Sequence, residues 1–185
     1  IMPSLVGSEM CIRDSIYTPL VKDVKFEMPY DEAKEWMLKA LEPMGKEYLD
    51  VVKEGLNHRW VDVYENKGKR SGGYSSGAHL TNPFILLNWS DTISDLYTLV
   101  HEFGHSAHSY FSRKNQPSNS SDYSIFVAEV ASTCNEALLS DYMDKHLDDD
   151  RRLLLLNQEL ERFRATLFRQ TMFAEFEHKI HQIEE

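Results

Sequence analysis

The chain has 185 residues, of which 42% are hydrophobic, so it is long enough to form one domain with a buried core. Its formal net charge of −10 opposes binding to nucleic acid and to anionic membranes, and no apolar run approaches the roughly 20 residues that a membrane-spanning helix needs. Two cysteines, Cys11 and Cys134, are too few for a disulfide framework, so we expect a soluble protein of the reducing cytoplasm.

The two ends of the sequence do not look like parts of a complete domain. Residues 1–15 lack the basic start and apolar stretch of a secretory signal, and they show no helix or strand period. They resemble the adapter remnant that is translated at the ends of some assembled reading frames, so we expect a non-native leader there. A helical pattern is still running at Glu185. We therefore interpret residues 16–185 as a partial catalytic domain that is truncated at its C-terminus.

The first half of the chain predicts a helix followed by two strands. Apolar residues recur at helical spacing over residues 31–55, where Pro43 should kink or restart the helix. After Trp60 the period shortens to two, and Phe84–Leu87 form a short apolar run, so each segment predicts a strand. Between them, residues 67–77 contain four glycines, which indicate turns or a backbone that another group approaches closely.

The second half of the chain predicts three helices. Ser90 or Asp91 can cap the first of them, and a polar loop follows at 113–121. The buried stripe of this first helix should contain Ile93, Leu96, Tyr97, Val100, Gly104, Ala107 and Phe111. A second helix is expected over 123–146 and a third from 148 to the end. The predicted fold is therefore mainly α with a small β-sheet.

Residues 101–105 read His-Glu-Phe-Gly-His inside the first of these helices. Side chains four residues apart project from one face of a helix, so His101 and His105 can both bind one zinc ion. Glu102 directly follows His101, so its side chain is rotated about the helix axis away from the two histidines. This position suits a base that activates water better than a third ligand. The pattern predicts one zinc ion per chain and the hydrolysis of peptide bonds.

A catalytic zinc site needs a third protein ligand and one open position. His108 is excluded as a ligand, because it lies about 10 Å along the helix axis from His101. Glu129 is the best candidate, since the next helix should return antiparallel and an unpaired carboxylate would be costly among the apolar residues 126–131. A buried salt bridge to Lys or Arg is the alternative role for Glu129.

Further predictions concern the surroundings of this site. Glu136 lies two turns beyond Glu129, where it could orient a ligand imidazole or be a plain surface carboxylate. His108 could donate or accept a hydrogen bond near the site. An exposed strand edge at 84–88 could pair with an extended peptide, which makes Gly72, Gly73 and Phe84 candidate substrate-binding residues.

Four segments together resemble one known family. They are WVDVYENKGKRSGGYSSG at 60–77, NPFILLNW at 82–89, TLVHEFGHSAHS at 98–109 and IFVAEVASTCNEALL at 125–139. They are similar to the thimet oligopeptidase family of zinc peptidases, and within it to the oligoendopeptidase F branch. The resemblance extends over residues 16–185.

The resemblance implies a zincin-like core, mostly helical around a deep channel, with a small sheet beside the active site. It places the family's zinc ligands on His101, His105 and Glu129 and its catalytic glutamate on Glu102, and it implies short oligopeptides as substrates. Family members are several-fold longer, and the His and Tyr residues that steady the developing charge lie beyond Glu185. The missing C-terminal part of the parent chain is therefore an expected partner.

Two alternatives to an oligopeptide endopeptidase remain open from the sequence. One is a fragment that binds zinc and peptide without turnover, because each lost oxyanion donor costs on the order of 10²-fold in rate. The other is a related carboxypeptidase-type zinc enzyme, which would share the site and differ in what closes the channel.

Overall fold

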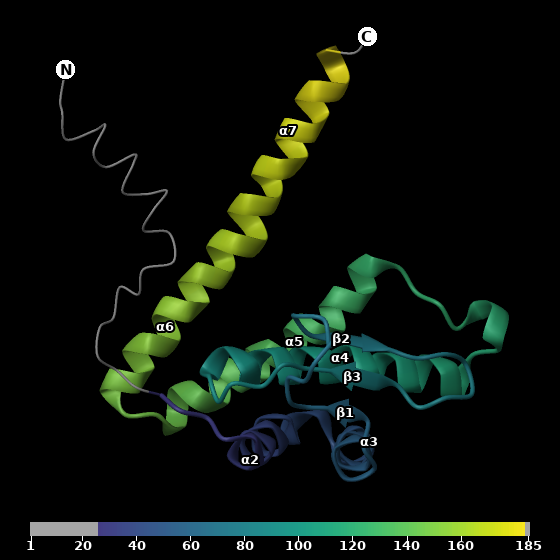
Figure 1. The fold of residues 1–185 in the computed structure, drawn as a ribbon, viewed down its shortest axis with the longest axis vertical. Helices are drawn as coiled ribbons and strands as arrows, with labels where there is room; N and C mark the ends of the chain where they lie inside the picture. The colour runs from purple at the N-terminus through teal and green to yellow at the C-terminus, as the bar shows by residue number, and fades with distance from the viewer. Residues whose placement is uncertain (1–25, 184–185) are drawn as a thin grey trace. The chain divides into compact units, whose positions relative to one another are not determined.

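A computed structural model of the chain describes residues 26–183. The leader predicted at 1–15, with Cys11, lies outside the described residues. Residues Phe26–Leu147 form one compact unit, and the described residues 148–183 belong to a second (Figure 1). All of the candidate site residues lie in the first unit.

The first unit begins with two helices separated by one short turn of 3-10 helix. These elements are α2 (Tyr30–Ala40), η1 (Glu42–Met44) and α3 (Lys46–Asn57). Pro43 lies in the first turn of η1, where the missing N–H of proline costs nothing, and Gly45 has a φ of +86° just before α3. The predicted restart of the helix at Pro43 is confirmed.

A three-stranded sheet follows, with strand order β1-β3-β2. Its strands are β1 (Val61–Asp62), β2 (Tyr74–Ser76) and β3 (Phe84–Leu86). β3 pairs in parallel with β1 and antiparallel with β2. The prediction of an exposed edge at 84–88 is wrong, because β3 is hydrogen-bonded on both sides. The described edge near the glycine-rich segment is β2, a strand that the sequence pattern did not predict.

Helix α4 (Ile93–Asn115) carries the His-Glu-Phe-Gly-His segment. Its cap is Thr92 instead of Ser90 or Asp91: the Thr92 side chain accepts from the Asp95 N–H, and the Asp95 carboxylate accepts from the Thr92 N–H. This reciprocal pair satisfies two N–H groups at the helix start. The helix also continues to Asn115, into the segment predicted as a loop. Within the predicted stripe every residue is buried except Phe111, which is half-buried.

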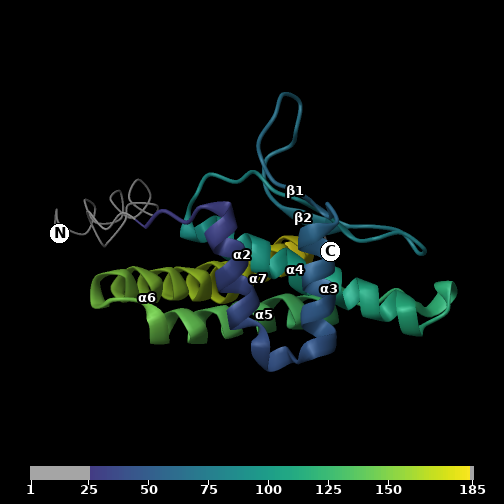
Figure 2. The ribbon, with the colours of Figure 1, turned by 90° about the horizontal axis from the view of Figure 1, so that it is seen from below.

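Helix α5 (Ile125–His146) packs antiparallel along α4 after a short 3-10 turn, η2 (Ser118–Ser120). Tyr97 of α4 hydrogen-bonds Ser140 of α5, whereas Gly104, further along α4, lies against Ser132, which is earlier in α5. Figure 2 shows α4 between the strands on one side and α5 on the other. Helix α4 is therefore the central element of this unit, and its two faces determine what surrounds the motif.

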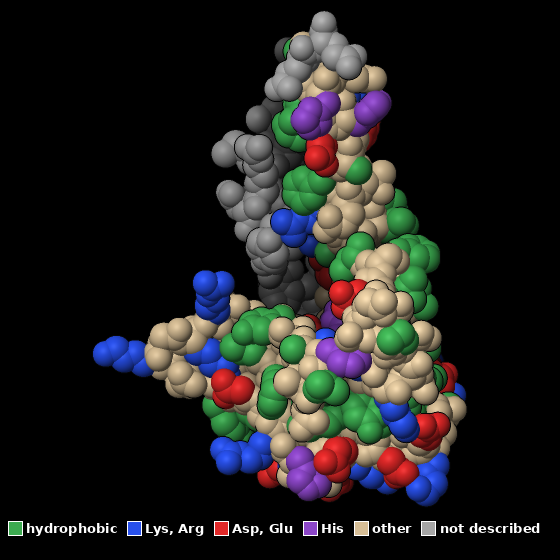
Figure 3. Space-filling model, turned by 90° about the vertical axis from the view of Figure 1, so that its right-hand side faces the viewer, with side chains coloured by type: hydrophobic (Ala, Val, Ile, Leu, Met, Phe, Trp, Pro, Cys, Tyr) green, Lys and Arg blue, Asp and Glu red, His purple; other side chains and the backbone are tan. Residues whose placement is uncertain are grey.

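The second unit is one long helical stretch. It consists of α6 (Asp149–Phe163), a π-helical turn η3 (Arg164–Phe168) and α7 (Arg169–Ile183). Asp148 caps it by accepting from the Arg151 N–H. Many large apolar side chains of this stretch are exposed, and Figure 3 shows hydrophobic surface along it. They are Leu153, Leu156, Leu160, Phe163, Leu167, Phe168, Met172, Phe173, Phe176, Ile180 and Ile183.

The fold is mainly α with a small sheet, as predicted. Among the described residues, no helix combines the length and the apolar character that crossing a membrane requires.

Candidate metal centre

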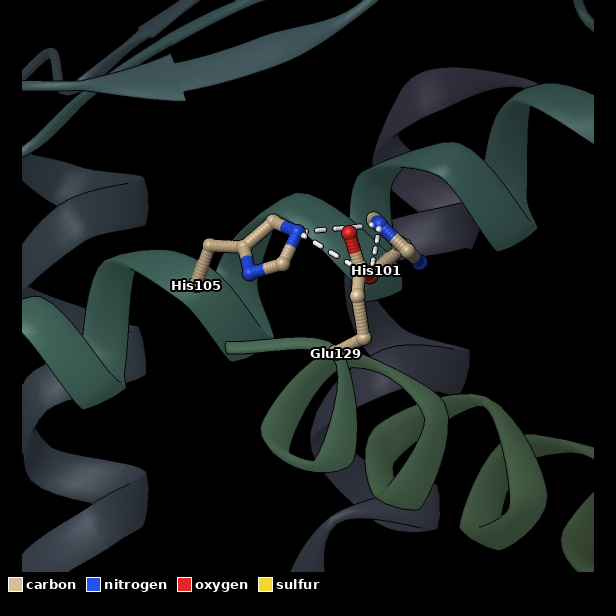
Figure 4. A group of neighbouring side chains, drawn as sticks. All are labelled: His101, His105 and Glu129. Carbon is tan, nitrogen blue, oxygen red and sulfur yellow. Dashed lines mark hydrogen bonds and ion pairs between the residues drawn. The ribbon is translucent and has the colours of Figure 1, made fainter. Parts of the chain in front are cut away.

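Two histidines of α4 and one glutamate of α5 point toward one another (Figure 4). His101 Nε2 lies 3.0 Å from His105 Nε2. Glu129 Oε2 lies 3.5 Å from His101 Nε2 and 3.6 Å from His105 Nε2. The structure therefore brings together the three side chains that were predicted to bind zinc, with their ligand atoms within 4.8 Å of one another.

These distances suit a tetrahedral ion. Zinc with bonds of about 2.0–2.2 Å holds its ligand atoms about 3.3–3.6 Å apart. The three measured separations, 3.0, 3.5 and 3.6 Å, are close to that range. Two imidazoles and one carboxylate are also a donor set of catalytic zinc sites, which leave a fourth position for water or substrate. The residues therefore fit one zinc ion.

Each histidine has a further hydrogen bond that orients its ring. Glu136 Oε1 lies 2.5 Å from His101 Nδ1, so this carboxylate contacts the ring nitrogen opposite the one that faces Glu129. A ring N–H of His105 donates to the backbone carbonyl of Ala128. Contacts of this kind fix the tautomer of a ligand imidazole and raise its basicity. Glu136 thus lies where the prediction of an orienting carboxylate required it.

The two imidazoles differ in their electrostatic surroundings. Burial alone would lower the pKa of His101, but the hydrogen bond to Glu136 and the nearby carboxylates raise that pKa above its ordinary value. Burial and the charge of His101 lower the pKa of His105. A metal ion would compete with a proton mainly at His101.

Glu102 is buried on α4, between the two histidines in sequence, with 7% of its surface exposed. Its burial raises the pKa of its carboxyl group, whereas His101 and a hydrogen bond from the backbone of Ser75 in β2 lower it, and the net shift is upward. The Ser75 hydroxyl is also 2.8 Å from the hydroxyl of Ser106 on α4. Ser75, which sequence reasoning missed, therefore connects the sheet to this carboxylate.

Glu129 does not lie in the buried apolar setting that the prediction assumed. Its side chain is 46% exposed, and its neighbours Phe126, Val127 and Val130 are exposed as well. The reason is that Ala128 and Ser132 are the buried residues of this part of α5, whereas its apolar residues Phe126, Val127 and Val130 are on the exposed side of the helix. The cost of an unpaired buried carboxylate was therefore the wrong argument, although the residue lies beside both histidines. The Ser132 hydroxyl donates to Glu129 Oε2 at 2.8 Å.

A glycine allows the two helices to approach closely beside the site. A Cβ atom built on Gly104 would lie 2.6 Å from Ser132 Cα and 2.9 Å from the backbone oxygen of Ala131. Such contacts are far shorter than van der Waals distances, so only glycine is accommodated without movement of a helix. Gly104 therefore sets the separation between the histidines and Glu129.

The remaining candidate residues, His108, Gly72, Gly73 and Phe84, lie in different places. His108 stacks on Tyr123 at a ring separation of 3.8 Å and is not part of the ligand group, and burial lowers its pKa. Gly72 and Gly73 line a hollow of about 220 Å³ beside the start of α4. Phe84 lines a different hollow of about 530 Å³ on the sheet, together with Tyr74. The structure does not bring Phe84 together with the two glycines in one pocket.

Comparison with known proteins agrees with the geometry. The sequence model of peptidase family M3 matches residues 13–185. Oligopeptidase PepF of Bacillus subtilis is 64% identical over 167 residues, which cover 90% of this chain and 25% of that protein. Group B oligopeptidase PepB of Streptococcus agalactiae is 52% identical over 167 residues, which cover 90% of this chain and 28% of that protein. The chain thus spans about a quarter of the length of these relatives.

Solved structures of peptidases also match this chain. The crystal structure of oligoendopeptidase-F from Enterococcus faecium matches 96% of this chain and 25% of its own, with a TM-score of 0.53 and 32% identity. A Chlamydophila abortus structure assigned as a peptidase matches 98% of this chain and 32% of its own, with a TM-score of 0.79 and 42% identity. The predicted resemblance to the oligoendopeptidase F branch is confirmed. Because the family match extends over nearly the whole sequence, this chain belongs to peptidase family M3.

Proposed function

We propose that this chain carries the metal and the catalytic base of a zinc metalloendopeptidase that hydrolyses short oligopeptides. The observation that supports it most directly is the group of His101, His105 and Glu129 ligand atoms within 4.8 Å, with the buried Glu102 beside them. Relatives that are named oligopeptidases, such as PepF, support the substrate class.

The proposed cofactor is one zinc ion per chain, held by His101, His105 and Glu129. When bound, zinc supplies a Lewis acid that polarises the scissile carbonyl and lowers the pKa of a water molecule toward about 7. Glu136 and the Ala128 carbonyl keep the two imidazoles in the orientation in which a nitrogen of each faces Glu129.

Glu102 is the proposed general base. Its carboxylate takes a proton from the attacking water and then gives that proton to the amide nitrogen of the leaving peptide. A raised pKa suits this double role, because a less acidic carboxyl group is a stronger base toward water. The backbone of Ser75 holds the carboxylate in place between these steps.

The edge of β2 is the proposed place for the peptide backbone. Among residues 26–183, β2 pairs only with β3, so its other edge can bind an extended peptide by backbone hydrogen bonds. Ser75 of this strand also contacts Glu102, so a peptide paired with β2 would lie near the base. Gly72 and Gly73 precede the strand and remain candidate substrate contacts, whereas Phe84 belongs to the central strand.

We also propose that residues 16–185 are part of a longer cytoplasmic catalytic domain. The supporting observation is that the relatives are about four times as long as the matched region. The groups that stabilise the developing oxyanion would then come from other parts of that longer protein.

The first test is the zinc content of the purified chain, of Glu129→Gln and of the exposed control Glu177→Gln. We expect one zinc ion per chain, lost in Glu129→Gln and retained in the control. A quenched fluorescent oligopeptide then measures hydrolysis by wild type and by Glu102→Gln, which should keep zinc and lose activity.

Each outcome has a definite meaning. Zinc binding with activity that depends on Glu102 supports the whole proposal. Zinc binding without turnover supports the metal site and assigns the remaining catalytic groups to the rest of the longer protein. A chain that binds no zinc would overturn the proposed metal centre.

A further inference from the structure

An asparagine on α5 is buried between three helices. Asn135 has no exposed surface, and its amide makes two hydrogen bonds. Its Nδ2 donates to the backbone oxygen of Val100 on α4 at 3.2 Å, and its Oδ1 accepts from the Tyr48 hydroxyl of α3 at 2.9 Å. Burial raises the pKa of Tyr48 to about 12, so this hydroxyl stays protonated and donates. The amide is therefore held from two sides.

Consecutive residues of α5 contact consecutive residues of α4 at this point. Asn135 contacts Val100, and the next residue, Glu136, contacts His101. The first contact is to the helix backbone, which cannot change rotamer, whereas the second is to a side chain, which can. The Asn135 contact therefore helps to define where α5 lies along α4, together with the Tyr97–Ser140 hydrogen bond and the close approach of Gly104 to Ser132.

The same register also determines the position of Glu129. Glu129 and Glu136 are seven residues apart on one face of α5, and they contact the Nε2 and Nδ1 sides of His101 respectively. A helix rises about 1.5 Å per residue, so an axial slip by one residue would move each carboxylate by roughly three-quarters of the length of a zinc bond. A metal site shared between two helices therefore needs something that fixes their axial register.

Apolar contacts alone fix such a register poorly. Leu139 and Met143 of α5 are buried, but apolar side chains can repack after a small axial shift at little cost. A buried amide cannot, because a shift leaves a buried polar group without its hydrogen-bond partner. A single buried asparagine fixes the register of helices in coiled coils for this reason.

We propose that Asn135, held by Tyr48, is a positioning residue that sets the axial register of α5 on α4 and thereby the geometry of the metal ligands. This inference rests on the proposed function, because it concerns the zinc site formed by His101, His105 and Glu129.

The test compares Asn135→Leu, which removes both hydrogen bonds at similar volume, with Tyr48→Phe, which removes only one hydroxyl. Zinc affinity is measured by competition with a chromogenic chelator, and the coordination geometry by the visible absorption of the Co²⁺-substituted protein. We expect zinc affinity to fall about 10-fold in Asn135→Leu and about 5-fold in Tyr48→Phe, with an altered Co²⁺ spectrum in both.

The control is Val52→Ala, which removes buried volume from the same helix as Tyr48. It should lower the thermal stability while leaving zinc affinity and the Co²⁺ spectrum as in wild type. If Asn135→Leu does not fold, Tyr48→Phe alone carries the test, because it removes a single hydroxyl from a half-buried ring.

Failure of the inference and failure of the proposed function are distinguishable. A wild-type chain that binds no zinc overturns the metal site itself. A wild-type chain that binds zinc, with Tyr48→Phe folded and unchanged in both affinity and spectrum, overturns only the positioning role of Asn135. A variant that loses stability but keeps its zinc affinity would show that Asn135 has a purely structural role. This outcome would also overturn the positioning role.

Discussion

Helix α4 and the α6–η3–α7 stretch both carry apolar side chains at helical spacing, yet their surroundings differ. Leu96, Leu99 and Val100 of α4 are fully buried between the sheet, α2, α3 and α5. In the second unit, Leu160 is 70% exposed and Phe176 is 63% exposed. Both stretches begin with a side chain that accepts a hydrogen bond from a backbone N–H, so both are well-formed helices. A helical period therefore predicts a helix, whereas burial depends on other elements of the fold.

The contrast has a functional counterpart. The candidate metal centre lies on α4, which is enclosed on several sides, and each of its two imidazoles lies close to a carboxylate of α5. The exposed stretch contributes no residue to that group of ligands. Four pairs of variants, each with one member in either region, separate what enclosure contributes to stability from what it contributes to metal binding.

The largest effect should come from truncating a buried leucine. Leu99→Ala removes a fully buried side chain and should lower the free energy of unfolding by about 3 kcal/mol. Leu160→Ala should change it by no more than about 0.5 kcal/mol. Urea denaturation followed by circular dichroism measures both. An equal cost at Leu160 would contradict the contrast, because it would show that another surface covers the second unit in solution.

A methyl group at the closest approach of α4 and α5 should have the next largest effect. In Gly104→Ala the new Cβ would meet the Ser132 backbone, so we expect a loss of about 2 kcal/mol in stability together with weaker zinc binding. Ala174→Val adds bulk to exposed helix α7 and serves as the control, with no change expected in either quantity. Unchanged zinc affinity in Gly104→Ala would mean that the helix separation does not limit the site.

The third prediction concerns pH and the contact between His101 and Glu136. In the metal-free protein, the raised pKa of His101 contributes stability that is present below about pH 6.5 and is lost as pH rises through the folded-state value. Zinc requires the neutral imidazole, so zinc affinity should rise with pH across the same interval. Without the Glu136 carboxylate the pKa of His101 should be lower, and the rise in zinc affinity should therefore occur at lower pH.

Glu136→Gln should accordingly bind zinc about 10-fold more weakly than wild type at pH 8, a difference of about 1.4 kcal/mol, and the gap should narrow at pH 6. Chelator competition at a series of pH values measures this. Glu175→Gln, on exposed helix α7, is the matched control. A constant ratio between Glu136→Gln and wild type at all pH values would argue against a Glu136 effect on the His101 pKa.

The smallest effect should come from the helix caps. Thr92→Ala removes the reciprocal cap of α4 and should cost about 1 kcal/mol, and Asp148→Ala should cost a similar amount at the start of α6. Thermal denaturation of both variants tests whether a cap contributes equally to the enclosed helix and to the exposed one. A large difference between them would show that the caps, and not only the surroundings, distinguish the two stretches.

The sequence predicted the elements whose signals are local. The break at Pro43 depends on proline alone, and the helix around residues 101–105 follows from its own apolar period. The spacing of His101 and His105 determines their common face without any other part of the chain. Such features could be predicted because the interacting residues are close in sequence.

The features that were missed depend on contacts between distant segments. Strand β2 lacks an alternating pattern, and it forms because β3 and α4 provide partners for it. The exposure of the residues around Glu129 depends on which side of α5 meets α4. Asn135 has no distinguishing spacing, and only its contacts with Tyr48 and Val100 reveal it. The one signal available was a polar side chain on the same helical stripe as Ala128, Leu139 and Met143.

The close approach at Gly104 also affects how the motif tolerates change. In the pattern His-Glu-x-x-His the two central positions are formally free, yet here one holds the fully buried Phe103 and the other a glycine in contact with a second backbone. A library randomised at both positions should therefore return almost only glycine at the second, even when selected for folding without zinc. A sequence search for sites built on a similar helix pair should therefore use a five-residue pattern in which four positions are restricted, namely the two histidines, the glutamate and the glycine.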